Sequence, residues 1–258
     1  MPVPNEFQTA DGNPPIALIT GGAKRIGAAF CRALAEDGFR VAIHCNRSRA
    51  EADELAAELP GEPIVLQADL ASPDIGALLV DALPAPPHLL LNNASLFEED
   101  SLQTLDLELW QRHMAVNLLA PTLLVQAFQR RLPGDARGLI VNLSDAKLAA
   151  PNPDFFSYTV SKIGLAGLTE LSARTLAPRI RVNAIAPAVT LVSGPQSRAN
   201  FEKAHVLNPL GRGVHVDDLV RALRYLVATP TITGETLRLD SGQRFLALPR
   251  DVAYMVQP

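Results

Sequence analysis

The chain has 258 residues, 48% of them hydrophobic and only 5% aromatic, and a formal net charge of −4 at pH 7. This length suits one α/β domain with an aliphatic core, and the absence of long basic runs argues against a nucleic-acid partner. Cys31 and Cys45 form neither a metal-ligand pattern nor a disulfide framework, so we expect no metal site and a cytoplasmic protein. No run reaches about 18 apolar residues, so we expect no membrane partner.

Apolar runs alternate with helix-compatible stretches along the chain. Residues 1–14 are polar and contain proline, and we expect them to be a mobile leader before a single domain at 15–258. The first strand is predicted at Ile16–Thr20 and the first helix at Arg25–Ala35. Further strands are predicted at 41–45, 63–67, 88–91, 138–143, 180–184 and 236–239, and further helices at 48–59, 107–131, 157–176 and 216–228. Successive βα units predict a doubly wound parallel sheet flanked by helices.

The segment between Pro187 and His215 is irregular, because Pro187, Pro195 and Pro209 interrupt helical patterns. We expect a substrate loop over about 188–215 that closes over a ligand. The tail after Arg244 has no clear pattern, and contact with another subunit is one interpretation of it.

A glycine-rich turn, Thr20-Gly21-Gly22-Ala23-Lys24-Arg25-Ile26-Gly27, follows the first predicted strand and opens the first helix. Small residues there let backbone amides and the positive helix end approach a pyrophosphate. A purely structural turn is the alternative for the motif alone. In its βα context the turn predicts a dinucleotide-binding loop with the contact residues Gly21, Lys24, Arg25, Ile26 and Gly27.

The second strand ends in His44-Cys45-Asn46-Arg47-Ser48, without the acidic residue that binds a ribose 2′-hydroxyl. Arg47 and Ser48 therefore favour NADPH over NADH. The alternatives are a solvated arginine and a helix-capping serine. The predicted cofactor contacts from the second, third and fourth strand ends are His44, Asn46, Arg47, Ser48, Asp69, Leu70, Asn93, Ala94 and Ser95, and a turn-capping role is the alternative for Asp69.

Tyr158 and Lys162 are four residues apart on a predicted helix, so their side chains share a face. Asp145 follows the fifth strand and Asn117 lies in the preceding long helix, and a doubly wound sheet brings both toward one crevice. Tyrosine has a pKa of about 10. We expect Lys162 and an oxidised nicotinamide to favour the phenolate and make Tyr158 a general acid. Lys162 is also expected to hold the nicotinamide ribose, and Asn117 to support a water that resupplies the proton.

Five motifs, taken in order, resemble the short-chain dehydrogenase/reductase family over nearly the whole chain: Thr20–Gly27, Asn92-Asn93-Ala94, Asn117, Tyr158-x-x-x-Lys162 and Val182–Pro187. The resemblance implies one Rossmann-type α/β domain with a parallel sheet of about seven strands. It also implies a nicotinamide cofactor and a homotetramer. Pro187, Tyr158 and Lys162 join the expected cofactor-binding residues.

At two positions the chain departs from the common family pattern and resembles the pteridine reductase branch, which includes bacterial dihydromonapterin reductases. Arg25 stands at the middle glycine of the fingerprint, and Asp145 stands thirteen residues before Tyr158, where most members carry a catalytic serine. The segment His44–Ser48 and Phe97 also resemble that branch. A purely solvated role for Arg25 is disfavoured, because a cation at a helix N-terminus is unfavourable without an anion.

The branch resemblance implies a pterin sandwiched between Phe97 and the nicotinamide, with Ser95 bonding to cofactor or substrate and Arg25 reaching both. A core-packed Phe97 and a turn-stabilising Ser95 are the alternatives. The expected substrate-binding residues are Arg25, Ser95, Phe97, Asp145 and Tyr158.

We therefore predict hydride transfer from NADPH to a C=N bond of a dihydropterin or dihydrofolate, which gives the tetrahydro form. Dihydromonapterin, dihydrobiopterin and dihydrofolate all remain open as substrates. The first alternative is an NADPH-dependent carbonyl or 3-oxoacyl-thioester reductase, against which Asp145 and Phe97 argue. The second is a non-catalytic NADPH-sensing regulator, against which the complete set of Asn117, Tyr158 and Lys162 argues.

Overall fold

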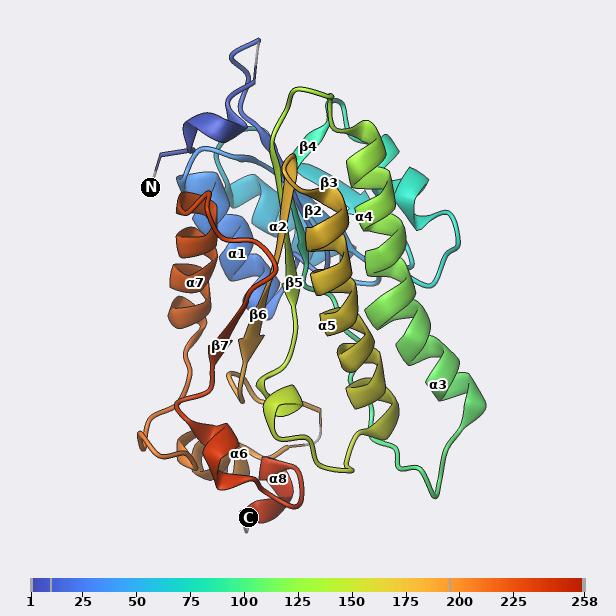
Figure 1. The fold of residues 1–258 in the computed structure, drawn as a ribbon, viewed down its shortest axis with the longest axis vertical. Helices are drawn as coiled ribbons and strands as arrows, with labels where there is room; N and C mark the ends of the chain where they lie inside the picture. The colour runs from blue at the N-terminus through green and yellow to red at the C-terminus, as the bar shows by residue number, and fades with distance from the viewer. Residues whose placement is uncertain (1, 10, 195, 257–258) are drawn as a thin grey trace.

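A computed structural model of the chain describes residues 2–9, 11–194 and 196–256 (Figure 1). Residues 1 and 10 of the expected leader, Pro195 of the expected substrate loop, and residues 257–258 lie outside the described residues. No helix within the described ranges is both long and apolar enough to cross a membrane. Nor do these ranges gather three or more His, Cys, Asp or Glu side chains in a metal-binding arrangement.

Seven parallel strands form one sheet in the order β3-β2-β1-β4-β5-β6-β7. The strands are β1 (Ile16–Ile19), β2 (Arg40–Cys45), β3 (Ile64–Gln67), β4 (Pro87–Asn92), β5 (Gly138–Leu143), β6 (Ile180–Pro187) and β7 (Thr236–Leu239). The central strands are buried along their whole length, which is the burial that their continuous apolar runs favour. The prediction of a doubly wound parallel sheet of about seven strands is confirmed.

Helices cover both faces of the sheet (Figure 1). One face packs against α1 (Arg25–Glu36), α2 (Arg49–Glu58) and α7 (Val216–Ala228), and the other against α4 (Ala120–Arg131) and α5 (Phe156–Leu176), with α3 (Leu107–Met114) lying beside α5. The predicted helix over 107–131 is interrupted by a π-helical turn, η3 (Ala115–Leu119). A second π turn, η2 (Ala77–Asp81), precedes β4. The strand order reverses between β1 and β4, so their carboxyl ends open a crevice.

The segment expected to be irregular contains a helix, α6 (Arg198–Val206), which the prediction missed. Its sequence lies between Pro187 and Pro209 and contains no proline itself, so the prolines bound the helix and do not break it. Ser197 caps it by accepting a hydrogen bond from the Asn200 amide at 3.2 Å. The sixth strand also runs on to Pro187, three residues beyond the predicted end.

Part of the segment expected to be a mobile leader packs against the domain. Phe7, in the 3-10 turn η1 (Asn5–Phe7), is fully buried, with its ring 6.0 Å from that of Phe39. Glu6 forms an ion pair with Arg181 of β6 at 2.8 Å. Hydrophobic burial and a half-buried charge pair thus fix these residues to the fold.

The tail after Arg244 folds back over its own chain. It forms the 3-10 turn η5 (Gln243–Leu246) and the short helix α8 (Val252–Met255), which lies beside α6 at the carboxyl end of the sheet (Figure 1). Asn200 of α6 donates to the Ala253 carbonyl at 2.9 Å and to the Val256 carbonyl at 3.2 Å. The tail therefore forms one wall of the region into which the strands point.

Candidate active site

A cavity of about 1110 Å³ lies at the carboxyl ends of the strands. It brings together thirteen of the residues singled out from the sequence: Gly21, Lys24, Arg25, Ile26, Gly27, Asn93, Ala94, Ser95, Phe97, Asp145, Tyr158, Lys162 and Pro187. Residues after β1, β4, β5 and β6 contribute because parallel strands end on one side of the sheet. Seven other predicted residues do not line it: His44, Asn46, Arg47, Ser48, Asp69, Leu70 and Asn117.

The glycine-rich turn depends on one glycine with a positive φ and on one close backbone approach. Gly21 has a φ of +61°, which a residue with a Cβ rarely adopts, and a Cβ at Gly27 would lie 2.1 Å from the Gly21 carbonyl oxygen. Asn93 closes the turn from β4, since its side-chain amide donates to the Thr20 and Gly21 carbonyls at 2.9 and 3.1 Å. The turn is thus held open as a cradle of backbone at the start of α1.

Arg25 adopts a left-handed backbone conformation with a φ of +56°. This geometry explains why glycine is common at this point of the family fingerprint. The Arg25 guanidinium donates to the Val192 carbonyl at 2.8 Å, so it joins the cofactor loop to the segment after β6. Its neighbour Lys24 forms an exposed ion pair with Glu51 of α2.

His44 supports the turn from behind. Its Nδ1 accepts a hydrogen bond from the Gly21 amide at 3.1 Å, and its Nε2 lies 3.1 Å from the Ala68 carbonyl. Burial lowers the pKa of His44, which favours the neutral ring that these two contacts require. With both ring nitrogens bonded within the protein, His44 supports the loop, and its direct contact with a cofactor stays a prediction.

The residues after β2 and β3 lie beyond the cavity lining. Asn46, Arg47 and Asp69 are exposed, and Ser48 is half-buried. Ser48 occupies the N-cap position of α2 without a side-chain capping bond, so the capping alternative for its hydroxyl is not realised. Asp69 accepts from the Ala71 amide at 3.0 Å, which is the turn-capping role weighed for it, and the next residue, Leu70, is buried.

Tyr158 donates a 2.6 Å hydrogen bond to Oδ2 of Asp145, and the Lys147 backbone amide donates to the other carboxylate oxygen at 2.8 Å. Burial and the Asp145 carboxylate raise the pKa of Tyr158 well above its usual value. The expected effect of Lys162 and an oxidised nicotinamide on the phenolate stays a prediction. The Lys162 ammonium donates to the Leu143 carbonyl at 2.8 Å and lies 5.7 Å from the centre of the tyrosine ring, so it does not contact the hydroxyl.

Lys162 is almost fully buried beneath Tyr158. Burial lowers its pKa to about 8, and the Asp145 carboxylate opposes that shift. Because the charged form is lost as pH rises through this value, the ammonium is present at neutral pH and declines above about pH 8.

Asn117 lies in the π turn η3, buried between the Ser95 loop and α5. Its carbonyl oxygen accepts from the Leu96 amide at 2.8 Å and the Ser95 hydroxyl at 3.2 Å. Its amide donates to the Leu96 carbonyl at 2.9 Å and the Ser161 hydroxyl at 3.0 Å. These contacts clamp the Ser95 loop to the helix of Tyr158, and the expected role in holding a water stays a prediction.

Phe97 is partly exposed in the cavity wall and meets the edge of Tyr158 at a centroid distance of 4.7 Å. Its ring stacks on Phe155 at 4.2 Å, and Phe155 in turn lies parallel to Tyr254 of the tail at 6.1 Å. The structure thus sets an aromatic side chain against the ring of the tyrosine that bonds to Asp145. A planar ring is well suited to such a wall.

Several cavity residues were missed by sequence reasoning. Lys147 follows Asp145 closely, and a charged residue so near a catalytic position was a signal that could have been used. Phe155, three residues before Tyr158, was a second such signal. Asp251 and Tyr254 of the tail line the cavity through tertiary packing alone, and no local motif marks them.

The chain belongs to the short-chain dehydrogenase family, because the family model described as short chain dehydrogenase matches residues 15–203. A crystal structure of FolM alternative dihydrofolate reductase 1 from Brucella canis, complexed with NADP, has 44% sequence identity to this chain. The two structures superpose with a TM-score of 0.84, and the match covers 90% of this chain and 95% of that chain. The corresponding Brucella suis structure, also in complex with NADP, has 44% identity, a TM-score of 0.85 and coverage of 90% and 96%.

A 3-oxoacyl-[acyl-carrier-protein] reductase of Synechocystis is 30% identical over 237 residues, which are 88% of this chain and 96% of that protein. The resemblance to the short-chain dehydrogenase family is therefore confirmed. The match to the pteridine reductase branch is supported by the higher identity to the two FolM structures.

Replacement of Gly27 by alanine tests the cradle. We expect Gly27→Ala to lower the free energy of unfolding by about 1–3 kcal/mol, because its methyl group would overlap the Gly21 carbonyl. It should also weaken NADPH binding, measured by fluorescence titration. Gly134→Ala is the matched control, since a Cβ there meets no atom within 4 Å. Equal stability and NADPH affinity in the two variants would contradict the proposed cradle.

Proposed function

We propose that the protein is an NADPH-dependent reductase that converts a dihydropterin or dihydrofolate to the tetrahydro form. The observation that carries the proposal is the 2.6 Å hydrogen bond between Tyr158 and Asp145, formed in the wall where Phe97 meets the tyrosine edge. A carboxylate at this point suits a substrate whose ring nitrogen takes up a proton. The 44% identity to two proteins described as alternative dihydrofolate reductases supports this substrate class.

The proposed cofactor is NADPH, which supplies a hydride when bound. The backbone turn from Gly21 to Gly27 fits a pyrophosphate, because Gly27 has no side chain and lets the first turn of α1 pack directly against the Gly21 carbonyl at the helix N-terminus. Arg47 and Ser48 fit a 2′-phosphate, since within the described ranges neither side chain has an ion pair or hydrogen bond. Two similar structures contain NADP, which supports the same cofactor here.

Tyr158 is the proposed proton donor. Its raised pKa keeps the phenol protonated in the buried site, and Asp145 orients the hydroxyl. Lys162 provides a positive charge beneath the ring to stabilise the tyrosinate once the proton has left. Asp145 then passes a proton back to Tyr158 from solvent, as a general acid–base group.

The proposed substrate-binding residues are Phe97, Ser95 and Arg25. Phe97 offers a flat apolar surface, Ser95 presents a hydroxyl held by Asn117, and Arg25 brings a cation bonded to the Val192 carbonyl. Together they fit a planar heterocycle with polar edges. Dihydromonapterin, dihydrobiopterin and dihydrofolate are the candidates.

The experiment follows NADPH oxidation by absorbance with these three substrates beside ketones and acetoacetyl thioesters. We expect turnover with pterin or folate, and roughly a 10²–10⁴-fold loss of kcat in Tyr158→Phe, which removes the proton donor. Asp145→Ser should lose pterin turnover while binding NADPH normally. Tyr225→Phe, at an exposed tyrosine on α7, is the control.

Efficient ketone or thioester reduction without pterin turnover would overturn the proposal in favour of the carbonyl reductase alternative. NADPH binding with no turnover on any substrate would favour the sensing regulator.

Arg47 is predicted to select the phosphorylated cofactor. We expect Arg47→Ala to weaken NADPH binding about tenfold or more, because a charge-assisted contact to the 2′-phosphate is lost, and to leave NADH binding unchanged. Fluorescence titration with both nucleotides measures this. Arg130→Ala, which removes an exposed arginine of α4, is the control. Equal weakening for NADPH and NADH would contradict the assignment.

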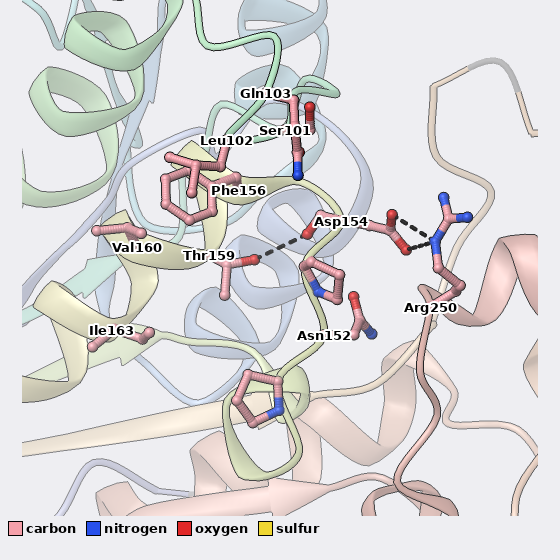
Figure 2. A pocket seen from close by; sticks show the side chains of 12 residues that line it. Ser101, Leu102, Gln103, Asn152, Asp154, Phe156, Thr159, Val160, Ile163 and Arg250 are labelled. Atoms are coloured by element: carbon pink, nitrogen blue, oxygen red, sulfur yellow. Dashed lines mark hydrogen bonds and ion pairs between the residues drawn. The ribbon is translucent and has the colours of Figure 1, made fainter.

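The proposed assembly is a cytoplasmic homotetramer. Within the described residues, the side chains of Leu119 of η3 and of Ile163 and Leu171 of α5 are largely exposed. Ile163 and Val160 also border an apolar cavity of about 560 Å³ (Figure 2). An exposed apolar helix face of this kind is typical of a subunit interface. The two cysteines, both buried and reduced, fit a cytoplasmic location.

Light scattering after size exclusion should give four times the chain mass of 27.7 kDa. Ile163→Asp should lower the mass, because a charge would be buried in the contact. Leu78→Asp, at an exposed leucine of η2, should leave the mass unchanged. A monomeric wild-type protein would refute the assembly.

A further inference from the structure

Lys147 is a buried lysine for which the proposed reaction has no role. It is one of four lysines in the chain, the others being Lys24, Lys162 and Lys203. Its side chain is only 9% exposed, although it lies in the short 3-10 turn η4 (Ala146–Ala149) that lines the cavity. An ammonium held out of water must be compensated by nearby acceptors or negative charges.

The compensation comes from three directions. The Lys147 ammonium donates to the Asp154 carbonyl at 2.5 Å, on the segment before α5, and lies 3.7 Å from the Asp251 carboxylate of the tail. It also lies 5.4 Å above the Phe155 ring. On its own element, its backbone amide donates to Asp145 at 2.8 Å. Lys147 is therefore bonded to the proposed catalytic aspartate and to the segment that leads into the helix of Tyr158.

The tail is fixed to that same segment. Arg250 donates to both carboxylate oxygens of Asp154 at 2.8 Å (Figure 2), and the Asp251 amide donates to Oδ2 of Asp154 at 2.6 Å. Asp251 then caps α8 by accepting from the Ala253 amide at 3.1 Å. These bonds place the Asp251 carboxylate beside Lys147, and they tie the tail to the turn that starts α5.

The segment before α5 affects the position of Tyr158, because Tyr158 lies in the first turn of that helix. Phe155, the residue before that helix, has a left-handed φ of +53°, so the chain enters α5 through a conformation that needs support from its surroundings. Lys147 holds the neighbouring Asp154 carbonyl on one side and the Asp145 carboxylate on the other. The contact to Asp145 comes from the Lys147 backbone amide, so the Lys147 side chain joins the two elements by reaching from η4, which Asp145 caps, to the Asp154 carbonyl before α5.

We propose that Lys147 is a positioning residue for the Asp145–Tyr158 pair, and that Asp251 of the C-terminal tail is its counter-charge. The inference rests on the proposed function, in which Asp145 and Tyr158 handle the proton. Lys147 acts through Asp145 and through the start of α5, and the reacting atoms belong to other residues. The tail therefore contributes to proton transfer from a distance in the sequence.

The charges around Lys147 determine the direction in which its pKa moves when one of them is removed, and this direction can be measured. Burial lowers the pKa of Lys147, while the carboxylates of Asp251, Asp145 and Asp154 raise it, and Arg250 is occupied by Asp154. Removal of the Asp251 carboxylate therefore makes the ammonium lose its proton at a lower pH. The part of kcat that depends on this charge must then decline at a lower pH as well.

The first test is an NMR pH titration of protein labelled at the lysine side chains. Only four signals are expected, and Lys→Arg variants assign them. Asp251→Asn should lower the titration midpoint of Lys147 by ~1 pH unit, since an opposite charge within a few ångströms moves a pKa by that order. The midpoint of Lys162 should stay in place. Asp81→Asn, which removes an exposed carboxylate on η2, is the control.

The second test compares pH profiles of kcat, KM for the pterin, and NADPH affinity. Lys147→Met should lower kcat about tenfold or more with NADPH affinity within about twofold of wild type, and Lys147→Arg should restore most of it. Asp251→Asn should move the alkaline limb of kcat to lower pH. Lys203→Met, at an exposed position on α6, should match wild type.

The proposal is overturned if folded Lys147→Met keeps the wild-type kcat and pH profile, or if Asp251→Asn leaves the Lys147 midpoint unchanged. If Lys147→Met does not fold, the lysine titration and the Asp251→Asn profile still decide the matter. Absence of pterin turnover in wild type would refute the proposed function separately, and the titration of Lys147 by NMR does not depend on turnover.

Discussion

The hydrogen bond between Tyr158 and Asp145 is the contact on which the proposed chemistry depends. A phenol and a carboxylate in a buried site form a strong, charge-assisted bond, because little water competes for either group. The same burial keeps the proton on Tyr158 until a better acceptor arrives. A serine in place of Asp145 could orient the tyrosine but could not carry charge, and this difference separates a ring-nitrogen substrate from a simple ketone.

The fold fixes that bond through a buried chain of polar side chains. Asn92 at the end of β4 donates to Asn142 of β5 at 2.8 Å, and Asn142 donates to Thr169 of α5 at 2.8 Å. Buried polar side chains that are bonded to one another in this way permit few alternative registers. These bonds fix the positions of β4, β5 and α5 relative to one another along the strand direction. Asp145, just beyond the end of β5, therefore meets Tyr158 in the first turn of α5.

The local sequence pattern was enough to predict the parallel sheet and the shared helix face of Tyr158 and Lys162. Continuous apolar runs mark buried parallel strands, and the four-residue spacing of Tyr158 and Lys162 determines a shared helix face. What the sequence did not reveal depends on tertiary contact. His44 near the end of β2 was predicted as a cofactor contact, and the sequence did not reveal that its ring bonds to Gly21 and Ala68. The helix α6 was hidden by the prolines on either side of it, and the pKa of Tyr158 depends on burial that no motif encodes.

Arg25 joins the glycine-rich turn to the segment after β6, although its position is unfavourable on two counts. Its left-handed backbone strains a residue with a Cβ, and its cation lies at the positive end of α1. The bond to the Val192 carbonyl offsets part of that cost. An anionic cofactor held at the helix end would offset the rest, and it would lie between the glycine-rich turn and the segment after β6. The arginine therefore links the glycine-rich turn to the segment after β6, and a glycine at this point would give the turn without that link.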